Sequence, residues 1–119
     1  MNKYRIQRFS TNLSIAAGQQ TGSSAAGFEV NGILRGITVS APAMTNATFT
    51  IAIKDGNSLG HTLFTSGNLD KAVVTPIFLF DANNPMMIPL SGKSTLTITS
   101  LGVEVAQRDF SIELLIDRG

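Results

Sequence analysis

The chain has 119 residues, of which 43% are hydrophobic and 14% are charged, and its formal net charge at pH 7 is +1. This length and apolar content predict one compact domain and exclude a disordered chain. The near-neutral charge argues against nucleic-acid binding, which needs a clustered basic face, and the absence of cysteine excludes disulfides, thiolate catalysis and cysteine-bound metals.

The first 26 residues are predicted to form an N-terminal arm and a flexible connection. Weak strands are expected at residues 4–9 and 13–16, and the small polar residues from 16 to 26 indicate a loop. Basic and apolar residues alternate in the first of these strands, so an extended backbone places them on opposite faces. These residues are Lys3, Tyr4, Arg5, Ile6, Arg8 and Phe9. Such a strand could add to the sheet edge of a neighbouring molecule or form an edge strand of its own sheet, and the sequence leaves both alternatives open.

Residues 27–119 are predicted to form the main β-domain. Apolar residues occupy every second position most clearly in segments 47–54, 95–99 and 110–116, which indicates half-buried strands. Weaker strands are expected at 28–30, 33–40, 62–65, 74–80 and 86–90. Gly32 and Gly36 indicate a bend or bulge within one long strand. Strands that recur about every 8 to 15 residues, without helical periodicity, predict an antiparallel sandwich or barrel.

No catalytic, cofactor or metal site is predicted. His61 is the single histidine, and although Asp55 and Ser58 lie nearby in the sequence, no nucleophile elbow accompanies them. We therefore expect an exposed or strand-edge histidine. The eight carboxylates, Glu104 and Glu113 among them, are expected mostly at turns or on outward rows, in contact with solvent. Segments 55–57 and 81–84 offer oxygen ligands but not the remainder of a calcium-binding loop.

Two adjacent methionines, Met86 and Met87, lie between Pro85 and Pro89. Adaptable apolar side chains between prolines could form a contact loop, or they could fill the core. Together with the six residues of the arm named above, the two methionines are the predicted partner-binding residues.

The sequence offers no membrane segment. No uninterrupted apolar run approaches the ~20 residues of a membrane helix. Residues 13–17 are too short and too polar for the apolar core of a signal peptide. We therefore expect a protein that is made and used inside a cell and has no membrane partner.

Segments 32–39, 48–51 leading to Asp55, 63–67 and 88–92 resemble small proteins of tailed-bacteriophage head modules, including capsid cement or decoration proteins. The resemblance implies that residues 27–119 form a jelly-roll-like β-sandwich. It also implies a homo-oligomer, a trimer or a dimer, that is made in the host cytoplasm and binds the major capsid protein on the outside of a mature shell. That family offers no catalytic residues to carry over.

Two other functions stay open at this point. The chain could be a different virion component, such as a tail, fibre or head-completion protein, which composition does not separate from a cement protein. It could also be a carbohydrate-binding β-sandwich, although tryptophan is absent and Tyr4 is the only tyrosine available as an aromatic platform.

Overall fold

The computed structural model describes residues 6–23, 28–29, 31–56, 61–79, 88–90 and 92–118. The regular secondary structure in these residues is entirely β-strand, as the alternating pattern predicts. The strands are β1 (Ile6–Ile15), β2 (Thr21–Ser23), β3 (Phe28–Glu29), β4 (Gly32–Ser40), β5 (Thr48–Asp55), β6 (Thr62–Thr65), β7 (Leu69–Asp70), β8 (Val74–Phe78), β9 (Ile88–Leu90), β10 (Lys93–Ser100) and β11 (Arg108–Asp117).

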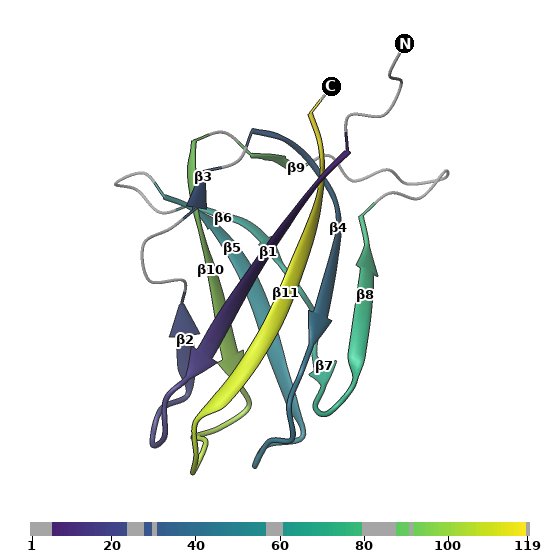
Figure 1. The fold of residues 1–119 in the computed structure, drawn as a ribbon. Coiled ribbons are helices and arrows are strands. Elements are labelled where there is room, and N and C mark those ends of the chain that lie inside the picture. Colours follow the sequence, from purple (N-terminus) through teal and green to yellow (C-terminus); the bar gives the residue numbers. More distant parts are fainter. Residues whose placement is uncertain are drawn as a thin grey trace.

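The strands form two antiparallel sheets that pack face to face (Figure 1). The first sheet has the order β1-β11-β4-β8, and β9 pairs with β4 beyond the end of β8. The second sheet has the order β2-β10-β5-β6, with β3 beside β10 and β7 beside β5. Because the chain passes repeatedly from one sheet to the other, consecutive long strands are seldom neighbours. This connectivity is that of a jelly roll, as the sequence resemblance implies.

The core lies between the sheets and is built from the inward rows of the long strands. In β5 and β10 buried apolar residues alternate with partly exposed ones, and the same alternation runs along β11. Phe49 of β5 and Phe110 of β11 join the two sheets, with ring centroids 5.0 Å apart and planes tilted by 60°. Full burial of each such side chain stabilises the fold by about 1.5–3 kcal/mol.

The N-terminal region belongs to the sandwich itself from residue 6 onward. β1 pairs with β11 over its whole length, from Ile6 opposite Asp117 to Ile15 opposite Arg108. Leu13 and Ile15 are buried and Phe9 packs against the core, so apolar burial holds this strand in the first sheet. Of the two alternatives that the sequence left open, the structure therefore has the edge strand of the protein's own sheet. The boundary predicted at residue 26 lies outside the described residues.

The expected flexible connection contains a turn and then β2. Gly22 of β2 lies so close to β1 that an added Cβ would stand 2.1 Å from the carbonyl oxygen of Ser14. A side chain does not fit there, which explains why a glycine closes this corner between the sheets. Within β4, the pairing with β11 shifts register between Gly36 and Leu34, which confirms the predicted bulge. In the described residues, no helix has the length and apolar character needed to cross a membrane.

Candidate functional site

The outer face of the first sheet brings together side chains that lie far apart in the sequence. Outward positions on β1, β11, β4 and β8 fall into register and form three rows across the sheet. The rows are Asn12-Ser111-Ser40-Val74, Ser10-Glu113-Thr38-Pro76 and Arg8-Leu115-Gly36-Phe78. The middle of this face is therefore made of short polar side chains.

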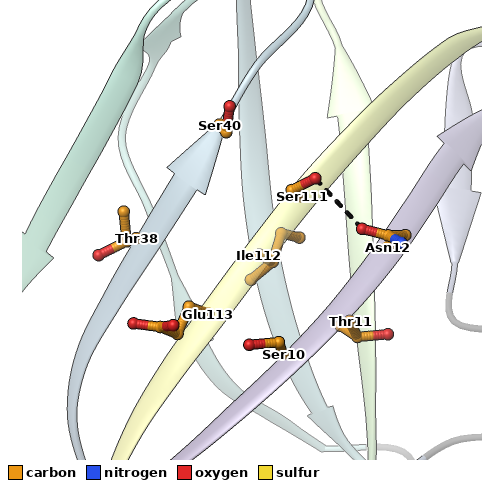
Figure 2. A pocket seen from close by; sticks show the side chains of 8 residues that line it. All are labelled: Ser10, Thr11, Asn12, Thr38, Ser40, Ser111, Ile112 and Glu113. Carbon is orange, nitrogen blue, oxygen red and sulfur yellow. Dashed lines mark hydrogen bonds between the residues drawn. The ribbon is translucent and has the colours of Figure 1, made fainter.

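An open groove of about 350 Å³ runs over this middle region. Figure 2 shows short polar side chains from the three strands along it. The residues that line it are Ser10, Thr11, Asn12, Thr38, Ser40, Ser111, Ile112 and Glu113. The groove offers hydroxyls, one amide and one carboxylate, which suits hydrogen bonding to a polar ligand or a polar protein surface.

The polar groups of the groove are only partly engaged with one another. The hydroxyl of Ser111 donates to Oδ1 of Asn12 at 3.2 Å. Nη1 of Arg8 lies 3.4 Å from Oε1 of Glu113, in a pair whose side chains are 73% and 36% exposed. Exposed pairs of this kind contribute about 0–1 kcal/mol, so Glu113 can turn toward a ligand at little cost.

An apolar strip borders the groove on the β8 side. We use this name for Val74, Pro76 and Phe78, whose side chains form the outward row of β8 and are all exposed. Val74 is 63% exposed and Phe78 is 80% exposed. Apolar residues on all three outward positions of an edge strand are unusual for a surface that meets only water.

A second apolar surface lies on the loop between β10 and β11. Leu101, Val103 and Val105 are 67%, 56% and 73% exposed, whereas Glu104 between them is 0% exposed. Alternation in this segment would place the valines inside and the glutamate outside. The structure has the reverse arrangement because the carboxylate of Glu104 finds four donors in the interior.

These donors come from two segments. Oε1 of Glu104 accepts hydrogen bonds from the backbone N–H of Thr45 at 2.8 Å and from Nε of Arg108 at 2.9 Å. Oε2 accepts from the backbone N–H of Asn46 at 3.0 Å and from its side-chain Nδ2 at 2.5 Å. The backbone of Glu104 adds bonds to Gly18 and Gln19. Glu104 therefore connects three loops by hydrogen bonds. They are the β1–β2 loop, the β4–β5 loop and its own β10–β11 loop.

The ionisation of Glu104 follows from these contacts. Burial alone would raise its pKa, but the hydrogen bonds from Asn46, Thr45 and Arg108 outweigh burial and lower the pKa to about 2. Glu104 is thus a charged, fully buried residue, and the expectation of solvent contact was wrong for it. We regard it as a structural anchor, because its carboxylate is enclosed and already satisfied.

The predicted site residues fall in different places. Lys3, Tyr4, Arg5, Met86 and Met87 lie outside the described residues. On β1, Ile6 is 48% exposed and Arg8 is exposed at the edge of the groove, whereas Phe9 points to the opposite side and packs against the core. Ile6 and Arg8 therefore share the outward face of β1 and Phe9 lies on the inward face, so the prediction of one basic and one apolar face is wrong for these three residues.

His61 is exposed immediately before β6, as expected. Its backbone carbonyl accepts a hydrogen bond from the N–H of Asp55 at 2.7 Å, which links the end of β5 to the residue before β6. His61 lies beside the second sheet, whereas the groove lies on the first. In the described part of the chain, no three acidic or histidine side chains gather as a metal site would need.

Comparison with known proteins identifies the fold. No family model and no curated protein matches the chain. A subunit of the disulfide-linked pili that form Bacillus endospore appendages is similar over 99% of this chain and 93% of its own, with 12% identity and a TM-score of 0.53. Chitosan-binding module 1 of a chitosanase/glucanase from Paenibacillus sp. IK-5 is similar over 94% of this chain and 95% of its own, with 10% identity and a TM-score of 0.50.

The protein of tomato aspermy virus is a weaker match, with 11% identity, a TM-score of 0.45, and coverage of 100% of this chain and 81% of its own. At such identities the likeness to the pilus subunit and the chitosan-binding module shows the β-sandwich fold alone. Because this chain has no cysteine, it cannot form the disulfide links named for the pili.

Proposed function

We propose that this protein is a structural virion subunit of the capsid cement or decoration type. It binds the outside of a phage capsid as an oligomer and stabilises the shell by bridging coat subunits. The observation that carries the proposal is the apolar strip Val74, Pro76 and Phe78, which is exposed on one strand of a small domain.

The strip is suited to contact through side chains rather than through strand addition. Pro76 in the middle of β8 has no backbone N–H, so an added strand would lose a donor there. Phe78 and Val74 instead project from the outer face, where a complementary apolar surface could cover them. The pairing of β8 with β4 fixes the backbone of these residues before binding, which reduces the entropy lost on docking.

The rest of the surface is suited to a partner that presents the same binding surface many times, as a lattice of coat subunits does. Only 14% of the residues are charged, and the polar part of the outer face consists of short hydroxyl and amide side chains. Contacts of this kind are individually modest. Many copies bound to one lattice, each bridging two coat subunits, gain affinity from avidity.

The test uses purified capsids that carry the protein, stripped of it and then supplied with it again. We expect cryo-electron microscopy to place many copies on the outside of the shell. Phe78→Ser should lower occupancy about tenfold or more, because it removes the largest side chain of the apolar strip. The control is Thr65→Ala, a change at an exposed residue of the second sheet. Location of the protein only in the tail, or unchanged occupancy with Phe78→Ser, would overturn the cement role.

A second candidate function is carbohydrate binding, favoured by the groove with its hydroxyls, its amide and the carboxylate of Glu113. The module similar in fold binds chitosan, a cationic sugar polymer, and Glu113 supplies the complementary charge. Calorimetric titration with chitosan oligosaccharides tests this function. Binding that is lost with Glu113→Gln and kept with Thr65→Ala would support it, and absence of binding by the unaltered protein would exclude it.

A further inference from the structure

The sheet edges of this sandwich differ in how well they are protected against pairing with another chain. An edge strand presents backbone donors and acceptors that can pair with a foreign strand, and folded proteins commonly protect such edges with short strands, bulges or proline. The two sheets have four edges, and in the described residues three of them carry such protection.

Both edges of the second sheet consist of short strands. One is divided between β2, with three residues, and β3, with two. The other is divided between β6, with four residues, and β7, with two. The pairing of β6 with β5 is further interrupted by a register shift between Ile53 and Lys54. Neither edge offers a long regular template.

In the first sheet, the edge formed by β8 and β9 is also interrupted. β8 has five residues with Pro76 at its centre, and β9 has three residues including Pro89. Each proline removes one donor from the edge.

β1 forms the fourth edge, and it has none of these features. It is ten residues long, contains no proline and pairs with β11 without a register shift. Arg8 is its only charged residue. Gly22 covers the end of the strand at Ser14, so among the described residues the stretch from residue 6 to residue 13 remains as a regular edge.

We propose that the β1 edge pairs with the β1 edge of a second copy of this chain, in antiparallel orientation about a two-fold axis. The first sheets of the two copies then form one continuous sheet. The partner is a second copy, because β1 is the one described edge that offers a long regular strand for pairing. Mutual pairing uses both β1 edges at once, so the assembly closes as a dimer and does not grow into a filament.

The alternation of side chains restricts the register. Residues that face each other across paired strands point to the same side of the sheet, so the two-fold axis must pass through a residue position. Ser10 is the outward residue nearest the centre of this stretch. With the axis at Ser10, Gln7 faces Leu13 and Arg8 faces Asn12 of the second copy. The two Arg8 positions are then separated by about 14 Å along the strand, which keeps like charges apart.

This dimer does not depend on the proposed virion role, so it is tested in solution without capsids. Sedimentation equilibrium of the full chain should show a monomer–dimer equilibrium. Ser10→Lys should raise the dimer dissociation constant about tenfold or more, because two lysines would face each other at the axis. In the monomer the new lysine lies beside Glu113, so folding should be preserved.

Thr38→Lys is the matched control, because Thr38 is also a cross-strand neighbour of Glu113 but lies on β4, away from the edge. It should leave the dissociation constant unchanged. A second measurement uses Ser10→Cys in a chain that has no cysteine of its own, with Thr38→Cys as its control. Mild oxidation should give a disulfide-linked dimer only with Ser10→Cys.

Three results would overturn the proposal. They are a strictly monomeric protein at about millimolar concentration, equal weakening by both lysine variants, and equal cross-linking by both cysteine variants. If the dimer is present and Phe78→Ser leaves capsid occupancy unchanged, the dimer stands and the cement role fails.

Discussion

Glu104 and Glu113 each lie beside an arginine, yet their surroundings give the two carboxylates opposite roles. Glu104 is fully buried, accepts hydrogen bonds from two backbone N–H groups, an amide and Arg108, and fastens three loops. Glu113 lies in an open groove and meets Arg8 at 3.4 Å in a pair that is largely exposed. The comparison teaches that burial and the number of hydrogen-bond donors decide how much a carboxylate contributes to the stability of the fold. The presence of an arginine beside it does not.

The largest expected effect is that of Glu104→Ala. Removal of the carboxylate leaves two backbone N–H groups and the mostly buried Arg108 without their acceptor. We expect the free energy of unfolding, measured by urea denaturation, to fall by about 3–5 kcal/mol. Glu113→Ala is the control and should change it by less than about 1 kcal/mol. Equal effects of the two substitutions would contradict the comparison.

The next effect is on the pH dependence of stability. The pKa of Glu104 is lowered to about 2 in the folded protein, below the ordinary value of 4.5 that we assign to the unfolded chain. The unfolded state therefore takes up a proton first as pH falls, so this stabilisation is present above about pH 5 and lost toward pH 2. The loss amounts to about 3 kcal/mol for this group.

Urea denaturation of the unaltered protein and of Glu104→Gln at a series of pH values isolates this contribution from that of the other acids. The difference in unfolding free energy between the two proteins should shrink as pH falls. A constant difference between pH 6 and pH 2.5 would mean that Glu104 is not the responsible group.

A smaller effect on stability is expected when a side-chain amide is removed beside Glu104 or from the groove that holds Glu113. Asn46→Ala deletes the Nδ2 group that donates to Glu104 and to the carbonyl of Val103 at 3.1 Å. We expect a loss of about 1–3 kcal/mol, as for a hydrogen bond to a charged group. Asn12→Ala, in the exposed groove, should cost less than about 0.5 kcal/mol. Thermal unfolding of the two variants under the same conditions measures the difference, and a larger loss for Asn12→Ala would reverse our ranking.

The smallest effect concerns the pair of Arg8 and Glu113. A double-mutant cycle with Arg8→Ala and Glu113→Ala should give a coupling energy below about 1 kcal/mol, and high salt should remove it. A coupling that persists at about 1 M salt would show that the pair is more protected than its exposure indicates.

The sequence predicted the long strands well because their burial pattern is local. Segments 47–54, 95–99 and 110–116 correspond closely to β5, β10 and β11. β1 was expected as two strands, since Ser10, Thr11 and Asn12 interrupt the apolar pattern at its middle. β2 and β7 were not predicted, because strands of three and two residues depend on distant partners for their existence.

The candidate site was less predictable for the same reason. Its rows join residues from β1, β4, β8 and β11, and their register is a property of the folded sheet. The apolar strip was visible only as part of a strand, because the sequence does not tell which face of an edge strand remains uncovered. Glu104 gave a misleading signal, since its four donors come mainly from a loop about 60 positions away along the chain.

The pairing of Ile6 with Asp117 has a practical consequence for engineering. The first and last described strand residues lie side by side, and Figure 1 shows that β1 begins and β11 ends at the same end of the sandwich. The loops held by Glu104 are at the other end. A short linker could therefore join the two ends and new termini could open in the exposed segment at Gly67 and Asn68, giving a circular permutant with the same core.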